Sequence, residues 1–121
     1  MRKYIPHILI ISFIFLLAPT VHVATYAGEV EDAKEEVRKS PDDALVHNGL
    51  GLAYYKSGKY KEAIESFKQA IRIDHDYAGA RFSLGFTYVN INDRDSALEQ
   101  YEILKSLDTE RAKELFDYIY E

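Results

Sequence analysis

The chain has 121 residues, a formal net charge of −5 and no cysteine. The lack of cysteine excludes disulfides, thiolate nucleophiles and cysteine-ligated zinc. Thirteen basic and twenty acidic residues follow Gly28, so this part of the chain alone carries a charge of −7. That balance argues against binding of nucleic acid or of anionic lipid, which both require clustered lysine and arginine.

The N-terminal segment has the layout of a secretory signal peptide over residues 1–27. Arg2 and Lys3 precede an apolar run from Ile8 to Ala18, and small residues lead to a predicted cleavage after Ala27. Eleven helical residues reach only about 16 Å, roughly half of a bilayer core. We therefore expect an exported protein, periplasmic or extracellular. The alternative is a membrane anchor formed by residues 5–26, and membrane contact is expected only in that case.

The rest of the chain contains an internal repeat with a period of 34 residues and no gap. Seven residues coincide at this spacing, and conservative matches lie around them. The identical pairs are Ala44/Ala78, Leu50/Leu84, Gly51/Gly85, Tyr54/Tyr88, Ala63/Ala97, Glu65/Glu99 and Asp74/Asp108.

Each repeated unit is predicted to form two helices. In the first unit Ser40 is the expected N-cap, Pro41 falls in the first turn, and Gly58 ends the helix in a left-handed conformation. A second helix is expected over residues 60–73. Its stripe consists of Ala63, Phe67, Ala70, Ile71 and Ile73.

The second unit is predicted to repeat this plan from about Asp76 to Asn90 and from about Asp93 to Leu107. Asn92 stands where Gly58 stood, and asparagine also tolerates the left-handed conformation. Flanking helices are expected from Glu29 to Lys39 and from Glu110 to Tyr120, both in the same register. The docking stripe of the last helix is predicted to be Leu115, Tyr118 and Ile119.

The repeated residues resemble the tetratricopeptide repeat (TPR), specifically its small exported bacterial members. A Leu-Gly pair, a tyrosine three residues later, and then small, aromatic and small residues are met in both units, the second less completely. The matching residues are Leu50, Gly51, Tyr54, Ala63, Phe67 and Ala70, then Leu84, Gly85, Tyr88, Ala97 and Tyr101. The resemblance implies an all-α fold, a short right-handed α-solenoid of stacked antiparallel helix pairs.

The predicted organisation has five parts. They are a signal peptide (1–27), an N-terminal flanking helix (28–43), a first TPR (44–77), a second TPR (78–111) and a C-terminal capping helix (112–121). Three stacked pairs are the usual minimum for such a repeat array to fold alone.

In the family that the chain resembles, the first helix of each pair lines a concave groove that binds another protein or peptide. The corresponding positions are Leu45, Asn48, Leu52, Tyr55, Lys56, Phe82, Phe86, Val89 and Asn90. Helix 76–90 also has a second apolar row at Phe82, Phe86 and Val89, which a soluble monomer seldom leaves in water. This apolar row is covered either by a partner or by the chain's own C-terminal helix, whose Phe116 and Tyr120 could reach inward.

Some family members hold a C-terminal carboxylate with basic residues in this groove. Here the corresponding places are held by Asn48, Leu52, Phe82 and Phe86, so the resemblance implies an apolar or amphipathic ligand instead. Two functions follow: a non-enzymatic scaffold or adaptor in the cell envelope, or a structural homodimer formed through the solenoid end faces. We expect no catalytic residue, cofactor or metal, because His47 and His75 fall at scaffold positions.

Overall fold

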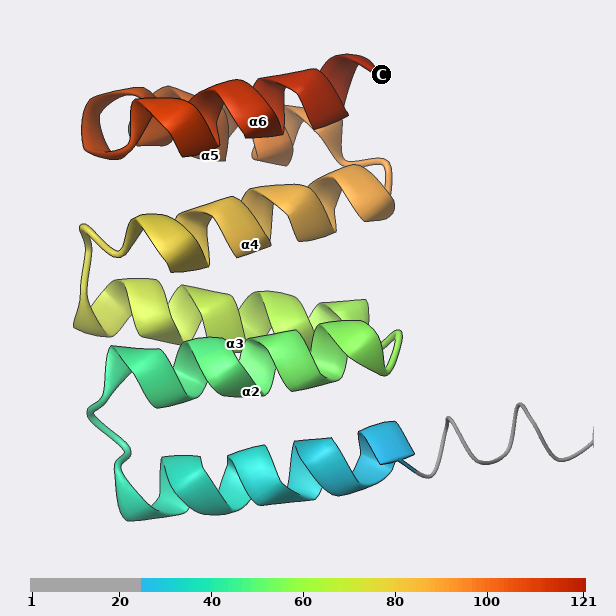
Figure 1. The fold of residues 1–121 in the computed structure, drawn as a ribbon, viewed down its shortest axis with the longest axis vertical. Coiled ribbons are helices and arrows are strands. Elements are labelled where there is room, and N and C mark those ends of the chain that lie inside the picture. Colours follow the sequence, from blue (N-terminus) through green and yellow to red (C-terminus); the bar gives the residue numbers. More distant parts are fainter. Residues whose placement is uncertain (1–24) are drawn as a thin grey trace, which may run out of the picture.

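In a computed structural model, residues 25–121 are described, and this part of the chain is folded into helices (Figure 1). A first helix covers residues 25–39. It is followed by α2 (Ala44–Lys56), α3 (Tyr60–Ile73), α4 (Ala78–Asn90), α5 (Arg94–Leu107) and α6 (Thr109–Tyr120). The predicted all-helical solenoid is confirmed. Most of the proposed signal peptide lies outside the described residues.

The helices stack as antiparallel neighbours in two layers. Helices α2, α4 and α6 lie on the side that faces the viewer in Figure 1, while α3 and α5 lie behind them. Contacts join α2 to α3, α3 to α4, α4 to α5 and α5 to α6, and they also join α4 to both α2 and α6. The layer formed by α2, α4 and α6 therefore presents one continuous face.

The first hairpin closes because a glycine lets its two helices approach. A Cβ placed on Gly51 in α2 would lie 2.4 Å from Cε1 of Phe67 in α3, so no larger residue fits beside this ring. Phe67 is fully buried, together with Ala63 and Ala70 of the same helix. Large and small residues thus face each other across α2 and α3, as close packing requires.

The second hairpin uses its equivalent glycine differently. A Cβ on Gly85 would lie 2.5 Å from Cδ2 of Leu115, which belongs to α6 rather than to α5. Leu115 is fully buried in a cluster that also contains Ala97 and Leu104 of α5. Helix α6 therefore supplies part of the core of the second unit.

Both turns inside the hairpins have the predicted backbone conformation. Gly58 has φ 72° and Asn92 has φ 62°, so both lie in the left-handed region. Glycine reaches this region without a steric penalty, and asparagine is among the residues that tolerate it. The match explains why Asn92 can replace Gly58 at the repeat spacing.

Three details differ from the prediction. Helix α2 begins at Ala44, and its N-cap is Asp43, whose Oδ1 accepts from the Leu45 N–H at 2.8 Å. Ser40 instead closes the preceding turn, where its carbonyl accepts from the Asp43 N–H at 3.2 Å. Helix α4 likewise begins at Ala78, two residues later than expected. In each case the loop residues form a turn before the helix starts.

The register of α6 is the third difference. Residues 74–77 connect α3 to α4, whereas Asp108 alone connects α5 to α6. The shorter connection rotates the last helix, so its buried residues are Ala112, Leu115 and Ile119, and Tyr118 is 37% exposed. Leu115 and Ile119 of the predicted stripe are thus buried, whereas Tyr118 stays exposed and contacts the ring of Phe86 at the edge of the stripe.

Candidate functional site

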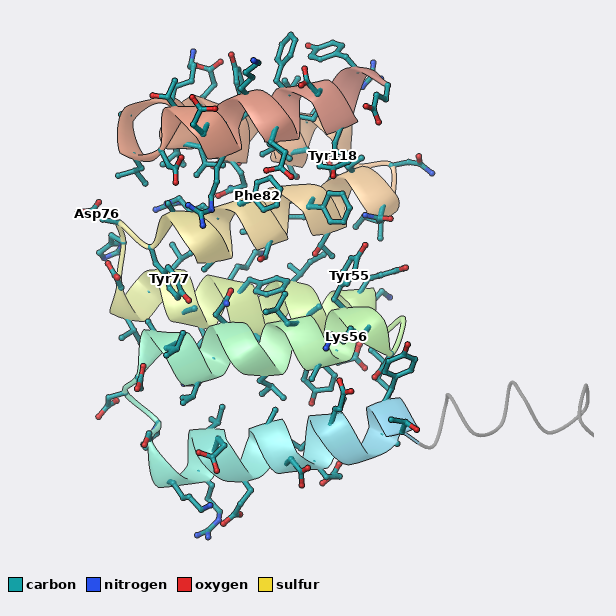
Figure 2. The ribbon with its side chains drawn as sticks, viewed as in Figure 1. Tyr55, Lys56, Asp76, Tyr77, Phe82 and Tyr118 are labelled. Carbon is teal, nitrogen blue, oxygen red and sulfur yellow. The ribbon has the colours of Figure 1, made fainter. Side chains whose placement is uncertain are left out.

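A groove of about 680 Å³ opens between α2, α4, α6 and the loop before α4. Figure 2 shows Asp76 and Tyr77 at the loop and Phe82 on α4. We call it the central groove. Its lining residues are Asn48, Asp74, Asp76, Tyr77, Ala78, Gly79, Phe82, Ser83, Arg111 and Glu114.

A row of aromatic rings crosses the same face. The ring of Phe86 lies 5.8 Å from that of Tyr55 on α2 and 4.7 Å from that of Tyr118 on α6. Phe82 stacks on Phe86 at 6.2 Å. We call Tyr55, Phe82, Phe86 and Tyr118 the aromatic row; Figure 2 labels three of its members. Tyr55, Phe82 and Phe86 are half-buried and Tyr118 is exposed, so the row keeps apolar surface open to solvent.

Asn90, the last residue of α4, holds two members of the aromatic row in place. Asn90 Nδ2 donates to the Phe86 carbonyl at 2.8 Å and also contacts the Tyr55 hydroxyl. Burial raises the pKa of the Tyr55 hydroxyl, and Tyr60 acts in the same direction, while the hydrogen bond from Asn90 opposes them. Tyr55 is therefore a neutral hydroxyl at physiological pH.

Asn48 places an amide in the wall of the central groove. Its side chain is only 8% exposed, and within residues 25–121 its Oδ1 has no hydrogen-bond partner. Leaving a buried polar atom unpaired costs about 1–3 kcal/mol. An amide offers both a donor and an acceptor, which is the pairing that a peptide backbone needs.

The charged residues of the central groove are mostly acidic. Asp74, Asp76 and Glu114 carry negative charge, and Arg111 is the one arginine among the lining residues. Arg111 forms an ion pair with Asp108, and its backbone N–H and guanidinium lower the pKa of that carboxyl below its usual value. The positive charge of Arg111 is therefore already matched by a carboxylate outside the groove.

The sequence-predicted site residues divide among three places. Asn48, Tyr55, Phe82, Phe86 and Asn90 gather along the central groove and the aromatic row. The other three lie elsewhere, and they are Leu45, Leu52 and Val89.

Leu45 and Leu52 line a separate cleft of about 420 Å³ between α2 and helix 25–39. Leu45 is 66% exposed and Leu52 is 40% exposed. Lys56 lies in the same cleft and pairs with Glu29 at 3.3 Å. This surface extends the α2 face away from the central groove.

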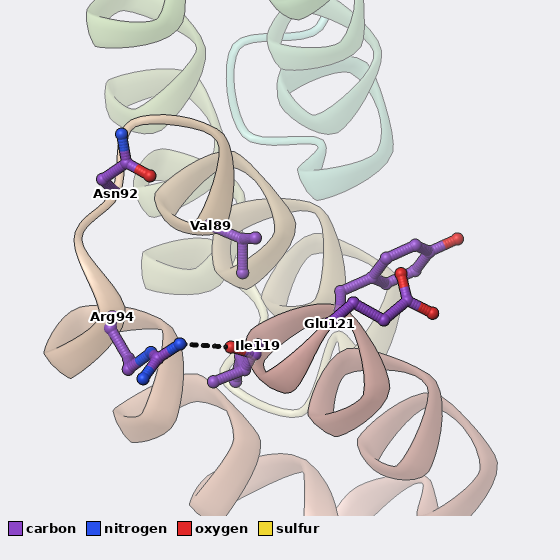
Figure 3. Close-up of a pocket in the computed structure, with 6 residues that line it drawn as sticks. Val89, Asn92, Arg94, Ile119 and Glu121 are labelled. Atoms are coloured by element: carbon purple, nitrogen blue, oxygen red, sulfur yellow. Dashed lines mark hydrogen bonds between the residues drawn. The ribbon is translucent and has the colours of Figure 1, made fainter.

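Val89 lies at the far end of α4, where it packs against the core shared with α5 and α6 (Figure 3). It borders a pocket of about 430 Å³ with Arg94 and Ile119. Arg94 Nη2 donates to the Ile119 carbonyl at 3.0 Å, so the start of α5 holds the end of α6. This pocket is a packing seam between helices.

The C-terminal helix contributes a different residue to the aromatic row from those expected. Phe116 and Tyr120 do not reach inward, because Phe116 packs on Tyr101 at 5.4 Å and on Tyr120 at 4.5 Å. Tyr118 contacts Phe86 instead. The shorter connection before α6 explains the change, and it also brings Arg111 and Glu114 to the groove. The repeat register gave no signal for these positions, because α6 departs from it.

Between residues 25 and 121, no group of three or more histidine, cysteine or carboxylate side chains is placed to hold a metal ion. His47 Nε2 lies 2.7 Å from the Pro41 carbonyl, so this ring is engaged by backbone. Over the same range, no helix combines the length and the apolar character needed to span a membrane.

The chain is similar to known proteins over its repeated part. Residues 51–92 match the family model described as "TPR repeat". Protein O-mannosyl-transferase Tmtc3 of Drosophila melanogaster is 35% identical over 65 residues, 54% of this chain and 7% of that protein. The peroxisomal targeting signal receptor of Candida albicans is 30% identical over 82 residues, 64% of this chain and 14% of that protein. The chain thus spans a small fraction of these relatives.

One solved structure is similar along almost the whole length. It is the NMR structure of the second TPR domain of human RPAP3 in complex with the HSP70 peptide SGPTIEEVD. The TM-score is 0.72 at 23% identity, covering 96% of this chain and 98% of that one. Residues 51–92 therefore resemble the TPR repeat, and the chain shares the helical solenoid fold of that TPR domain.

Proposed function

We propose that this protein binds a peptide segment of another protein along the central groove and the aromatic row. The observation that carries the proposal is the combination of half-exposed rings with the unpaired amide of Asn48 in one face. An extended segment would cover the rings, and a rotation of the buried Asn48 side chain would let the same segment pair with its amide. The known relatives support this reading, because one is named as a targeting-signal receptor and another was solved with a bound peptide.

The aromatic row is large enough to supply useful affinity. Full burial of one large apolar side chain contributes about 1.5–3 kcal/mol. Three or four such contacts, reduced by the cost of association, correspond to binding of about micromolar strength. The ligand is therefore an apolar or amphipathic segment, and the protein acts as a non-enzymatic adaptor.

The proposal includes export to the cell envelope or beyond. Export is supported by the sequence of residues 1–27, in which a positively charged start is followed by an apolar run and then by small residues. If the protein is exported, fractionation of the native host will place the mature chain outside the cytoplasm. A deletion of residues 1–27 will then keep it inside, and equal distribution of both forms would contradict export.

Site-specific photo-crosslinking tests the groove. A photoreactive residue in place of Ser83, which lines the groove, is expected to give a discrete adduct in the native host. The same residue in place of Glu99, which is exposed on α5, is the matched control and should give none. Phe86→Arg should remove the Ser83 adduct while leaving the far-UV circular dichroism unchanged. Persistence of the adduct in that variant would contradict the proposal.

A second variant separates binding from folding. Asn48→Leu removes the unpaired amide and keeps a similar volume, so the free energy of unfolding should rise by about 1 kcal/mol. Loss of the donor and acceptor should weaken the adduct at Ser83. Urea unfolding and crosslinking measure the two effects. A less stable variant with full crosslinking would show that the amide serves packing rather than a ligand.

A homodimer is the second candidate, favoured by aromatic side chains on the outer face of α6. Phe116 is 41% exposed and Tyr120 is 53% exposed, and they form one cluster with Tyr101. Such a cluster could pair with a second copy. Phe116→Glu with Tyr120→Glu should then halve the mass measured by light scattering at micromolar concentration. A monomeric wild-type protein would remove this candidate.

A further inference from the structure

We propose, resting on the proposed function, that the segment bound in the central groove carries positive charge. It places an arginine or lysine among Asp74, Asp76 and Glu114 and an apolar side chain on the aromatic row. The ligand is thus a basic amphipathic segment of another protein. The inference follows from the charges at one end of the groove, from the unpaired amide beside them and from the rings at the other end.

The carboxylates of the groove have no cationic partner within the described chain. Seven ion pairs occur among residues 25–121, and none of them involves Asp74, Asp76 or Glu114. Arg111 is paired with Asp108. The neighbouring Arg81 directs its Nε to the His75 carbonyl at 3.0 Å and its Nη1 to Gln100 at 3.3 Å. The groove therefore keeps an excess of negative charge.

Asn48 supplies an independent sign that a ligand lies here. The amide is more than nine-tenths buried in the groove wall, and its Oδ1 has no hydrogen-bond partner within residues 25–121. A carbonyl-type oxygen beside several carboxylates favours a donor, either a peptide N–H or a guanidinium. The amide oxygen and the carboxylate oxygens are thus all acceptors, and one of them, Asp74 Oδ1, already accepts from the Asp76 N–H at 3.1 Å. A carboxylate-bearing ligand would instead meet repulsion at this end.

The distance between the acidic residues and the aromatic row sets how far apart the cation and the apolar side chain of the ligand must lie. Figure 2 shows Asp76 at the start of α4, and Tyr55 and Tyr118 near its other end. Gly79 lines the acidic end and Phe86 lies at the centre of the aromatic row. Seven residues of helix cover about 10 Å, which an extended chain spans with about three residues. The cation and the apolar anchor should therefore lie about three residues apart.

Three fluorescent ten-residue peptides test the charge directly. All contain one leucine anchor, and the residue three positions away is arginine, glutamine or glutamate. Fluorescence anisotropy with the full chain should give the tightest binding for the arginine peptide, about tenfold tighter than for the glutamate peptide at low salt. The difference should shrink at high salt, because exposed charges are screened.

Paired variants identify the carboxylates. Asp76→Asn with Glu114→Gln should weaken binding of the arginine peptide about three- to tenfold and leave the glutamine peptide unchanged. Glu65→Gln with Glu99→Gln makes the same charge change on α3 and α5, which form the other layer, and should have no such effect. Unfolding by urea should show that both variants remain folded.

The outcomes separate this inference from the proposed function. Equal or tighter binding of the glutamine or glutamate peptide would overturn the positive charge while leaving groove binding intact. Binding by none of the peptides, or binding that Phe86→Arg does not reduce, would contradict the proposed function itself. Selective loss of arginine-peptide binding in the Asp76 and Glu114 variant would support both.

Discussion

Gly49 and Gly51 lie two residues apart on α2 and meet different surroundings. A Cβ on Gly51 would lie 2.4 Å from the Phe67 ring, whereas one on Gly49 would meet nothing within 4 Å. Gly51→Ala should lower the free energy of unfolding by about 1–3 kcal/mol, because the buried ring must move. Gly49→Ala should raise it by about 0.5–1 kcal/mol, because alanine favours the helix.

Urea unfolding of the two variants beside the wild type measures this contrast. Both variants replace a glycine of α2 with alanine, so each is the control for the other. Equal shifts of the same sign would mean that the contact between Gly51 and Phe67 does not set the distance between α2 and α3.

At the residue scale, the sequence predicted the face on which a side chain lies better than it predicted the hydrogen bonds of that side chain. The family resemblance assigned Asn48 and Phe86 to the groove-lining side, and both lie on that face, whereas Leu45, Leu52 and Val89 of the same assignment lie elsewhere. It could not predict that Asn48 lacks a hydrogen-bond partner, because the partner of a buried amide depends on neighbouring helices. The N-cap of α2 was misassigned to Ser40 for a related reason, since both Ser40 and Asp43 are good caps.

Leu115 and Phe116 are neighbours in α6 with opposite surroundings. Leu115 is fully buried against Gly85, and Phe116 is 41% exposed. Leu115→Ala should lower the free energy of unfolding by about 2–5 kcal/mol through the cavity it leaves. Phe116→Ala should cost less than about 1 kcal/mol, because most surface changes are small. Thermal and urea unfolding will distinguish them, and similar costs would contradict the placement of α6.

The starts of α5 and α6 are expected to make stability depend on pH. Hydrogen bonds from Ser96 lower the pKa of Asp93, and those from Arg111 lower the pKa of Asp108. The ionised caps therefore stabilise the fold above the unfolded pKa, which is near 3.8. This stabilisation is lost as the pH falls through the lower folded values.

Melting temperatures measured from neutral to strongly acidic pH test this expectation. The wild type should lose stability on acidification more steeply than Asp93→Asn or Asp108→Asn, because asparagine still caps a helix but carries no charge. If the melting temperatures of the wild type and the variants fell in parallel with pH, these carboxylates would not be the cause of the pH dependence of stability.

The helices are not equally anchored across the whole molecule. In helix 25–39, Val30 is the one buried residue, and the ion pairs Glu31–Lys34 and Glu36–Lys39 lie on its own surface. By contrast, α3 buries five residues. Because a solenoid is held by contacts between neighbours, its least buried end should open first.

Native-state hydrogen exchange tests this order. Amides of helix 25–39 should exchange at a lower opening free energy than those of α3 and α5. Val30→Ala should speed exchange in helix 25–39 and leave α5 unchanged. A single opening free energy for all helices would indicate that the chain unfolds as one unit.

At the scale of the molecule, the fold followed from the repeat and the groove charges did not. A period of 34 residues and the helix stop signals predicted the stacked hairpins, because these features are local or periodic. The acidic end of the groove is formed by residues of distant segments, Asp76 in a loop and Glu114 on α6, and α6 departs from the register. Contacts between distant segments at a changed spacing leave no periodic signal.

The different partners of the two glycines bear on how this chain could be divided or recombined. The space beside Gly51 is filled by Phe67 of its own unit, while the space beside Gly85 is filled by Leu115 of the segment that follows. A fragment cut at the sequence boundary after residue 111 would leave a gap beside Gly85. Grafting experiments should therefore move residues 78–120 as one cassette, with its last helix retained.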